Sequence, residues 1–520
     1  MSTSASGPSL APEKLFNNME NEEGTRAAER TSTAEPSPAE SCLVQTTVGE
    51  VEGFVDTSFP HVKQWLGVPF AEPPIGQRRF APPVPKTALP AGQVLSATRM
   101  PPAPMQSYTS LPNIYAKYTP EYLASGPYSE DCLYLNVFAP AGKTTEPLPT
   151  LVFFYGGQGE WGGINSEYMQ PQSWIERSQD HIVVLFNWRV GVFGFPNAKG
   201  LRNGPLGLLD QRLALEFIRD NISGFGGSPS SVVAFGQAAG SACIDAHLFA
   251  WPDDPIVSAA VCFAGAMLGV VSQDKDKESF KRLARRLGCP EDATPEEQIA
   301  FVREVDAGAI IGCFRAYNDS EAEPKMYFRP QIDNVVILTP EEQLERAGQG
   351  KFAKVPVLLG MTAEEGNGLV PYRELAAGED SAVTAAVNWT SRFQGVLDKV
   401  SDYRLANKCT TYRCVYAGDF PNISPKPWMK AYHFSELPMI MGTHEIERGQ
   451  STDFQRQLSE TMQDMWVAFA RDPEKGLSAW GWQAASCECS SPMVLGKNKT
   501  LFHQENNPSQ REIPLVGGKR

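Results

Sequence analysis

Five short apolar runs, rich in β-branched and aromatic residues and each closed by a turn, constrain the fold of this chain most. Runs of this length without regular polar alternation are typical of strands covered on both faces, as in a parallel sheet. Helical patterns lie between several of them and predict an α/β fold with a mostly parallel central sheet flanked by helices. The five runs are LYLNVFAP from Leu133, TLVFFYGG from Thr150, IVVLFNWRVGVFG from Ile182, VVAFG from Val232 and VPVLLG from Val355.

Other segments carry structural expectations of their own. Residues 207–225 predict a helix whose apolar face holds Leu208, Leu213, Leu215, Phe217 and Ile218. Residues 46–55 predict a hairpin, and the proline-rich residues 67–83 predict an extended surface segment. Residues 255–273, the longest nearly uncharged stretch, predict a buried strand and a turn rather than a membrane span.

The beginning of the chain differs in composition from the rest. Residues 1–41 are rich in Ser, Pro, Ala and Glu and lack the apolar core of a secretory signal, so we expect a disordered leader before one domain spanning residues 42–520. The ten cysteines form no metal-type pair of CxxC elements. We therefore expect free thiols in a reducing, cytoplasmic compartment.

Charge and composition limit the class of partner. The 46 Lys and Arg residues against 60 Asp and Glu give a net charge of −14, and no basic stripe is present to neutralise phosphates. This argues against nucleic acid as a partner. We expect a small-molecule substrate, no membrane span and neither a metal nor an organic cofactor, and the sequence leaves the oligomeric state open.

Residues 232–249, VVAFGQAAGSACIDAHLF, run from an apolar strand through a glycine-flanked turn into a helical pattern. Such an elbow lifts a serine nucleophile above the sheet in serine esterases, because the glycines allow the sharp, strained turn. The central residue here is Ala238, whose methyl group cannot act as a nucleophile.

Three further places hold candidate catalytic groups. The Gly-rich residues 153–163, FFYGGQGEWGG, can aim N–H groups at an oxyanion, although most such stretches are only turns. Glu364 and Glu365 follow a strand, where a carboxylate either orients a histidine or forms a solvated turn. His433 lies among apolar residues, where a histidine more often packs than reacts. His247 and His444 compete with it for the role of base.

The order of elbow, acid and histidine is that of the α/β-hydrolases, and the chain resembles the type-B carboxylesterase/lipase family. The resemblance rests on residues 67–83, GVPFAEPPIGQRRFAPP, on residues 129–140, SEDCLYLNVFAP, and on residues 204–240, which include the elbow. It implies an ion pair between Arg79 and Glu130. It also assigns the site: Ala238 at the nucleophile's position, Glu365 as the acid, His433 as the base, and Gly156, Gly157 and the N–H of Ala239 as the oxyanion hole.

The chain also departs from that family. Gln158 replaces the third glycine of the oxyanion turn, and a positive φ there would cost about 1–3 kcal/mol. Ala264 replaces a serine that supports the triad in many relatives. Cys132 has no partner in the preceding RMPPAPMQ block, in contrast to secreted relatives. The aromatic cation-binding features of cholinesterases are not recognisable, which argues against choline esters.

Three interpretations of Ala238 stay open. In the first, the chain is an ester hydrolase whose serine has been replaced. In the second, it is a non-hydrolytic enzyme that uses His433 as a general base and the oxyanion turn to stabilise an enolate or alkoxide. In the third, it is an inactive relative that serves as an intracellular binding protein.

Overall fold

The computed structural model describes residues 42–107, 113–142, 144–201, 204–269, 274, 277–486 and 491–504. Contacts within the chain separate Met1–Glu40 from Ser41–Arg520, and the fold described here is that of the second unit. The predicted leader, residues 1–41, lies outside the described residues.

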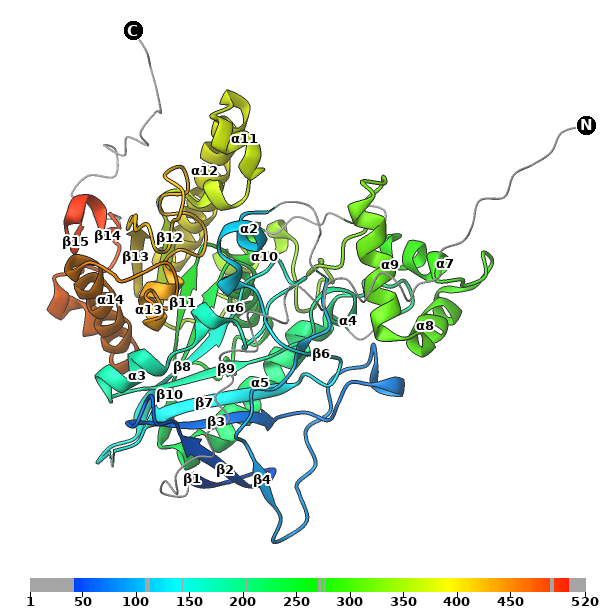
Figure 1. Cartoon of the computed structure of the whole chain (residues 1–520), viewed down its shortest axis with the longest axis horizontal. Helices are drawn as coiled ribbons and strands as arrows, with labels where there is room; N and C mark the ends of the chain where they lie inside the picture. The colour runs from blue at the N-terminus through cyan, green and yellow to red at the C-terminus, as the bar shows by residue number, and fades with distance from the viewer. Residues whose placement is uncertain are drawn as a thin grey trace, which may run out of the picture. The chain divides into compact units, whose positions relative to one another are not determined.

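One large sheet organises this unit (Figure 1). Its strands run parallel from β9 through β14, and antiparallel strands extend it at both edges. β4 (Val94–Ser96) pairs with β2, and β5 (Ala103–Pro104) pairs with β6 (Tyr128–Ser129) in a separate small sheet. The strands in spatial order are β1 (Cys42–Thr46), β2 (Gly49–Val55), β3 (Val62–Pro69), β7 (Tyr134–Pro140), β9 (Ile182–Phe186), β8 (Leu148–Phe154), β10 (Gly227–Gln237), β11 (Ala259–Phe263), β12 (Val357–Thr362), β13 (Thr411–Tyr416), β14 (Met493–Leu495) and β15 (Phe502–Gln504).

The sequence-based prediction of the fold class is confirmed. Each of the five apolar runs overlaps a strand, namely β7, β8, β9, β10 and β12, and every residue of β9 and β12 is buried. The segment 255–273 contains the buried strand β11, as predicted. Long apolar runs form these central strands because helices cover both faces of the sheet.

The helices occupy the connections between strands and the segments that follow them. Among the described residues no helix is both long and apolar enough to cross a bilayer. The helices are α2 (Ile114–Tyr118), α3 (Gln172–Ser178), α4 (Gly191–Gly194), α5 (Leu206–Asn221), α6 (Ala239–Ala250), α7 (Ser279–Arg286), α8 (Pro295–Glu304), α9 (Ala307–Asp319), α10 (Pro340–Gly348), α11 (Tyr372–Ala377), α12 (Asp380–Ala406), α13 (Leu437–Met441) and α14 (Asp453–Arg471).

Neighbouring residues of β10 show how two helices cover the sheet. The ring of Phe235 meets Trp466 of α14, with centroids 6.4 Å apart. A Cβ built on Gly236 would lie 2.6 Å from Cδ1 of Ile244 in α6. Because successive residues of a strand point to opposite faces, α6 and α14 lie on opposite sides of the sheet. The predicted helix 207–225 is also found, as α5 and a short 3₁₀ turn, although Leu213 is only half-buried.

Two local expectations need correction. The hairpin begins before residue 46, because Cys42–Thr46 pairs with Gly49–Val55 around the turn at Thr47 and Val48. The proline-rich residues 67–83 are not a surface segment throughout, since Phe70 and Phe80 are each only 1% exposed. Proline prevents regular strand pairing but does not prevent burial of the side chains between prolines. Phe80 packs edge-on against Phe280 of α7, with ring centroids 5.6 Å apart.

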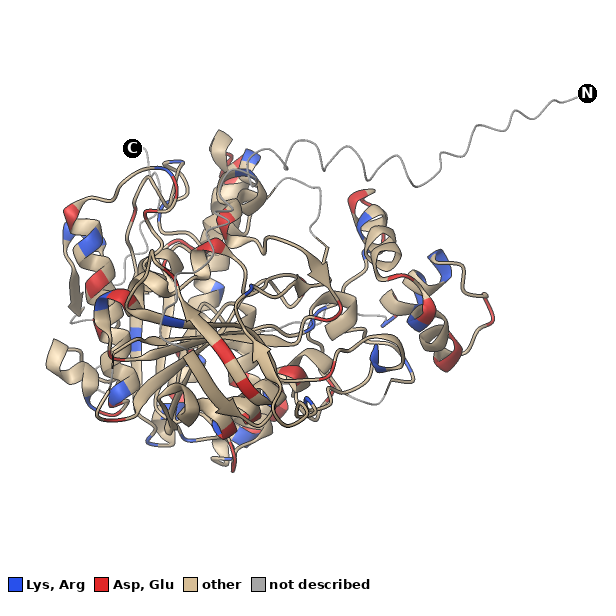
Figure 2. Ribbon diagram, turned by 60° about the horizontal axis from the view of Figure 1, so that its bottom comes forward, with Lys and Arg blue, Asp and Glu red and all other residues tan. Residues whose placement is uncertain are grey.

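Charged groups are interspersed over the ribbon in Figure 2, but one ion pair is largely buried. Arg79 Nε donates to Glu130 Oε1 at 2.6 Å, Nη2 donates to the other carboxylate oxygen, and the two side chains are 8% and 12% exposed. Arg79 Nη1 also donates to the backbone carbonyls of Val302 and Arg303 at the end of α8, at 3.0 and 2.9 Å. A cation at this position stabilises the carbonyl end of the helix. The pair that the family resemblance implied is therefore present.

Replacing Arg79 with methionine tests this pair. We expect Arg79→Met to lower the free energy of unfolding by about 3–5 kcal/mol, because it leaves the Glu130 carboxylate buried and unpaired. Urea unfolding followed by far-UV circular dichroism measures the change.

The matched control is Arg471→Met, because Arg471 pairs with Asp180 at the surface, where the side chains are 57% and 37% exposed. An exposed pair contributes about 0–1 kcal/mol. Equal losses in the two variants would contradict a special role for the Arg79 pair.

Candidate active site

The turn between β10 and α6 has the backbone of a nucleophile elbow. β10 ends at Gln237, α6 begins at Ala239, and Ala238 between them has φ 49° and ψ −115°. A residue with a Cβ seldom adopts such angles, because they are sterically unfavourable. The N–H of Ala238 donates to the carbonyl of Phe263 at the end of β11, at 2.8 Å. The strained turn is thus formed with alanine at its centre.

Glycines around Ala238 allow three segments to approach closely. A Cβ on Gly240 would lie 2.1 Å from the carbonyl oxygen of Phe154, and one on Gly265 would lie 2.2 Å from the carbonyl oxygen of Ala238. Contacts this short cannot exist, so glycine is required at both positions. Ser241 Oγ donates to the Gly265 carbonyl at 2.6 Å and ties the loop after β11 to α6.

The glycine-rich turn after β8 packs against the segment that carries His433. A Cβ on Gly156 would lie 2.7 Å from the ring of Phe434, and one on Gly157, which has φ 106°, would lie 2.1 Å from the Trp161 carbonyl. Gln158 has φ 61°, so the residue that replaces the third glycine adopts the left-handed conformation. The steric cost expected at this position is therefore present, at about 1–3 kcal/mol.

Glu365 and His433 are in direct contact and buried. Glu365 follows β12 and is 0% exposed, and His433 is 3% exposed. One carboxylate oxygen, Oε1, accepts the backbone N–H of Thr362 at 2.6 Å, and the other forms a short hydrogen bond with His433 Nδ1. A carboxylate held at Nδ1 fixes the orientation of the imidazole and leaves Nε2 for a reactant.

Backbone pairing brings these two residues together from distant parts of the chain. The N–H of Glu364 donates to the carbonyl of Ala431 at 3.0 Å, and Glu364 forms an isolated parallel bridge with Tyr432. The residues that follow, Glu365 and His433, are therefore neighbours. On the other side, Tyr115 Oη donates to the His433 carbonyl at 3.1 Å.

The competing histidines have other surroundings. His247 is buried on α6 with Nε2 3.1 Å from Gln211 Oε1, and burial lowers its pKa to about 3. His444 Nδ1 lies 2.7 Å from Ser451 Oγ. Neither residue lines the pocket that contains His433.

A pocket of about 730 Å³ lies beside these groups, although Glu365 and Gly156 are not among its lining residues. Ala238, Ala239, Gly157 and His433 all line it, and Ala264 and Gln158 lie on its wall. The Phe393 ring lies 5.5 Å from the His433 ring, between centroids. The lining segments are the turn after β8, the start of α6, the loop between residues 264 and 269, residues 327–331, one side of α12 and the His433–Phe434 stretch.

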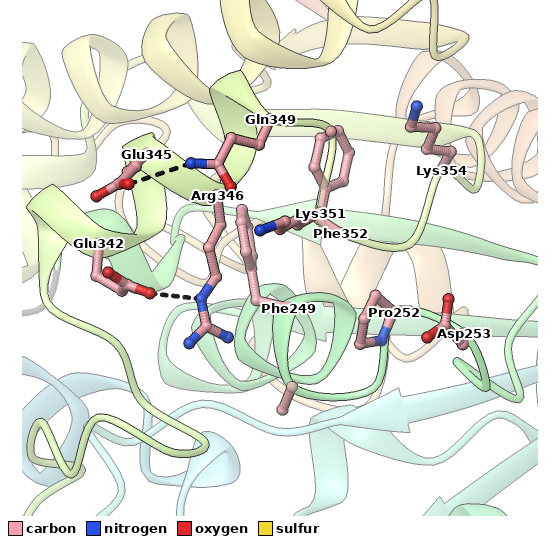
Figure 3. A pocket seen from close by; sticks show the side chains of 12 residues that line it. Phe249, Pro252, Asp253, Glu342, Glu345, Arg346, Gln349, Lys351, Phe352 and Lys354 are labelled. Carbon is pink, nitrogen blue, oxygen red and sulfur yellow. Dashed lines mark hydrogen bonds and ion pairs between the residues drawn. The ribbon is translucent and has the colours of Figure 1, made fainter.

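A second surface pocket, of about 940 Å³, lies between the end of α6 and α10 (Figure 3). Two pairs of its polar side chains are hydrogen-bonded: Arg346 Nε donates to Glu342 at 2.7 Å, and Gln349 Nε2 donates to Glu345 at 3.1 Å. None of the candidate catalytic residues lines it. The 730 Å³ pocket, which His433 and Ala238 line, is therefore the candidate site. Among the described residues no group of three or more His, Cys, Asp or Glu side chains is arranged to hold a metal ion.

Sequence reasoning missed a buried carboxyl group near the pair. Glu436, three residues after His433, is 0% exposed. Burial, and to a smaller degree the nearby Glu365 carboxylate, raise the pKa of Glu436 well above its usual range. The short spacing between His433 and Glu436 could have indicated that Glu436 lies near the pair. The burial of Glu436, however, depends on tertiary packing.

Comparisons with known proteins identify the family of this chain. The Carboxylesterase family profile matches residues 40–398 and 381–513. Chlorogenic acid esterase from Aspergillus niger is 39% identical over 441 residues, which cover 84% of each chain. Secreted lipase 5 from Gibberella zeae is 36% identical over 485 residues, with 86% of this chain and 88% of the relative covered. Para-nitrobenzyl esterase from Bacillus subtilis is 28% identical over 514 residues, covering 91% of this chain and 99% of the relative.

The chain belongs to the carboxylesterase family. The fold is thus that of the α/β-hydrolases, and the family acts on carboxylic esters.

The strain at the elbow is testable by removing one methyl group. We expect Ala238→Gly to raise the free energy of unfolding by about 1 kcal/mol, because relief of a disfavoured φ outweighs the greater freedom of glycine in the unfolded chain. Urea unfolding of both proteins measures the difference.

Ala242→Gly is the matched control, because Ala242 lies on the same helix, α6, within its regular part. Glycine inside a helix destabilises it by about 1 kcal/mol. A destabilised Ala238→Gly variant would show that the turn stores no strain.

Proposed function

We propose that this chain acts on a small apolar ester, lactone or related carbonyl compound by proton transfer, without a covalent acyl-enzyme. His433 is the general base, Glu365 orients it, and the N–H groups of Gly156, Gly157 and Ala239 stabilise the oxyanion. Ala238 occupies the nucleophile's position. In this proposal residues 42–520 form one catalytic domain.

One observation carries the proposal: His433, which is hydrogen-bonded to Glu365, lines the same pocket as the elbow and the glycine-rich turn. A base with a fixed tautomer, together with donors aimed at a carbonyl oxygen, is sufficient for enolisation, elimination, isomerisation or cyclisation. A covalent intermediate would need a side-chain oxygen or sulfur at the elbow, and alanine has neither.

The steps follow from the geometry. The substrate carbonyl oxygen accepts hydrogen bonds from the backbone donors, which stabilises the negative charge that develops when a neighbouring C–H or O–H bond loses its proton. His433 Nε2 takes that proton. The imidazolium that forms is stabilised by the Glu365 carboxylate at Nδ1, and the same nitrogen returns the proton to another atom of the substrate. Positioned acid–base catalysis of this kind is worth about 10²–10⁴-fold in rate.

Proton abstraction by His433 is measurable with a simple ketone. We expect the native chain to exchange the α-protons of phenylacetone for deuterium in D₂O, and His433→Ala to slow this exchange by about 100-fold or more. Proton NMR follows the exchange.

His61→Ala is the control, because His61 is an exposed histidine outside the pocket. Equal exchange rates in the native and His433→Ala chains would contradict general-base catalysis. They would favour the alternative function, an ester-binding protein without turnover.

Restoring a serine tests the remaining parts of the site. We expect the native chain to form no adduct with a fluorophosphonate probe at residues 236–240, because alanine has no Oγ, and loss of the nucleophile costs on the order of a million-fold in turnover. Ala238→Ser should be labelled there and should hydrolyse short acyl esters weakly. Mass spectrometry and release of p-nitrophenol measure the two outcomes.

The double variant Ala238→Ser/His433→Ala is the control and should lose both properties. If Ala238→Ser folds normally but neither reacts nor is labelled, the site is not that of a replaced serine hydrolase. Since one relative is named for chlorogenic acid, that ester is the first natural compound to test with Ala238→Ser.

The cytoplasmic location predicted from the sequence remains part of this proposal. The eight described cysteines, Cys132 among them, are free thiols, which is consistent with a reducing compartment. One relative is named as secreted, so fractionation of the producing cells decides the location.

A further inference from the structure

Two arginines, and no acidic side chain, are among the described residues that line the 730 Å³ pocket. Most of the other lining side chains are apolar or aromatic. The whole chain carries a net charge of −14, so a cationic group in an apolar pocket departs from the charge of the protein as a whole. Arginine in such a place commonly recognises a planar anion.

The charge of one of these arginines, Arg329, is already balanced. Its Nη2 lies 2.8 Å from Glu160 Oε2, and both side chains are partly buried. Its guanidinium also lies over the Tyr327 ring, 5.2 Å from the centroid. Arg329 is thus a structural part of the pocket wall.

The other arginine, Arg392, lines the pocket as an exposed residue and forms no ion pair with any residue that the structure describes. Its Nη2 donates to the backbone carbonyl of Gly269 at 3.0 Å, and its guanidinium lies 5.2 Å from the centroid of the Trp389 ring. These two neutral contacts hold the side chain at the pocket wall and leave most of its five N–H donors for a ligand. A cation held in place in this way binds an anion with a smaller loss of side-chain entropy.

Helix α12 relates Arg392 to the catalytic pair. Trp389, Arg392, Phe393 and Val396 line the pocket at the spacing of one helical face. Phe393, the next residue after Arg392, has its ring 5.5 Å from that of His433. The cation and the base therefore belong to one cavity and are separated by an aromatic surface.

We propose that the substrate carries a carboxylate, which Arg392 binds while the reacting carbonyl lies at His433. This inference rests on the proposed function of the same site and adds its substrate class: an amphiphilic molecule with an apolar or aromatic body, an ester or related carbonyl, and an anionic group at a distance from it. Arg392 determines specificity and takes no part in proton transfer.

A pair of esters that differ by one charge tests this inference. Monobenzyl glutarate carries a free carboxylate, and benzyl methyl glutarate is its neutral counterpart. We expect the native chain to bind the anionic ester up to about fivefold more tightly, since an ion pair at an exposed arginine contributes about 0–1 kcal/mol. Isothermal titration calorimetry measures both affinities, and chromatography checks that the esters stay intact.

Variants of Arg392 assign the preference to this side chain. Arg392→Met should bind both esters with similar affinity, and Arg392→Lys should keep part of the preference because it keeps the charge but not the planar pair of donors. Arg373→Met is the matched control: Arg373 is exposed, as Arg392 is, and also lies over a neighbouring aromatic ring, that of Tyr372, but it is outside the pocket. It should leave both affinities unchanged.

Three outcomes would overturn the inference: equal binding of the two esters by the native chain, a preference that survives in Arg392→Met, or no binding of either ester. Binding at equilibrium does not require proton transfer, so His433→Ala should keep the preference for the anion. If the native chain does not prefer the anionic ester, but its exchange of the phenylacetone α-protons still depends on His433, only the substrate class is refuted. If the native chain prefers the anionic ester but does not exchange the phenylacetone α-protons, only the proposed catalysis is refuted.

Discussion

Close packing around the turn between β10 and α6 is the constraint on which the candidate site depends. The carbonyl of Phe154 at the end of β8, the start of α6 and the loop after β11 meet there at distances that exclude a Cβ on Gly240 and Gly265. Because three neighbouring strands end at this point, small displacements of any one of them would produce overlap. The turn therefore fixes where the N–H of Ala239 points and where the floor of the pocket lies.

Glu365 and His433 are held by a separate set of interactions. The backbone contacts of Glu364 with Ala431 and Tyr432 align two segments, and the Thr362 N–H and the His433 ring engage the two oxygens of Glu365. None of these hydrogen bonds involves the residue at the elbow. The Glu365–His433 pair is therefore ordered in a chain that has alanine at the elbow.

The sequence was informative where local pattern and burial coincide, as in the apolar runs that form β8, β9 and β12. It was less informative for β13, where TYRCVY alternates between buried and half-buried residues and gives a weaker signal. The burial of Phe80 was missed because proline content reports on hydrogen bonding and not on packing. The contact between Glu365 and His433 could be anticipated from chain order, but the position of Arg392 on the pocket wall could not, since it depends on where a long helix meets the sheet.

Alanine at a turn that is already strained also has a genetic consequence. Every alanine codon becomes a serine codon by one change in its first base, and the backbone at position 238 already has the angles of a nucleophile elbow. Ala238 lines the pocket, so a serine at this position would lie at the pocket wall. A lineage can therefore gain or lose a hydroxyl nucleophile here in a single mutational step, while the surrounding architecture stays the same.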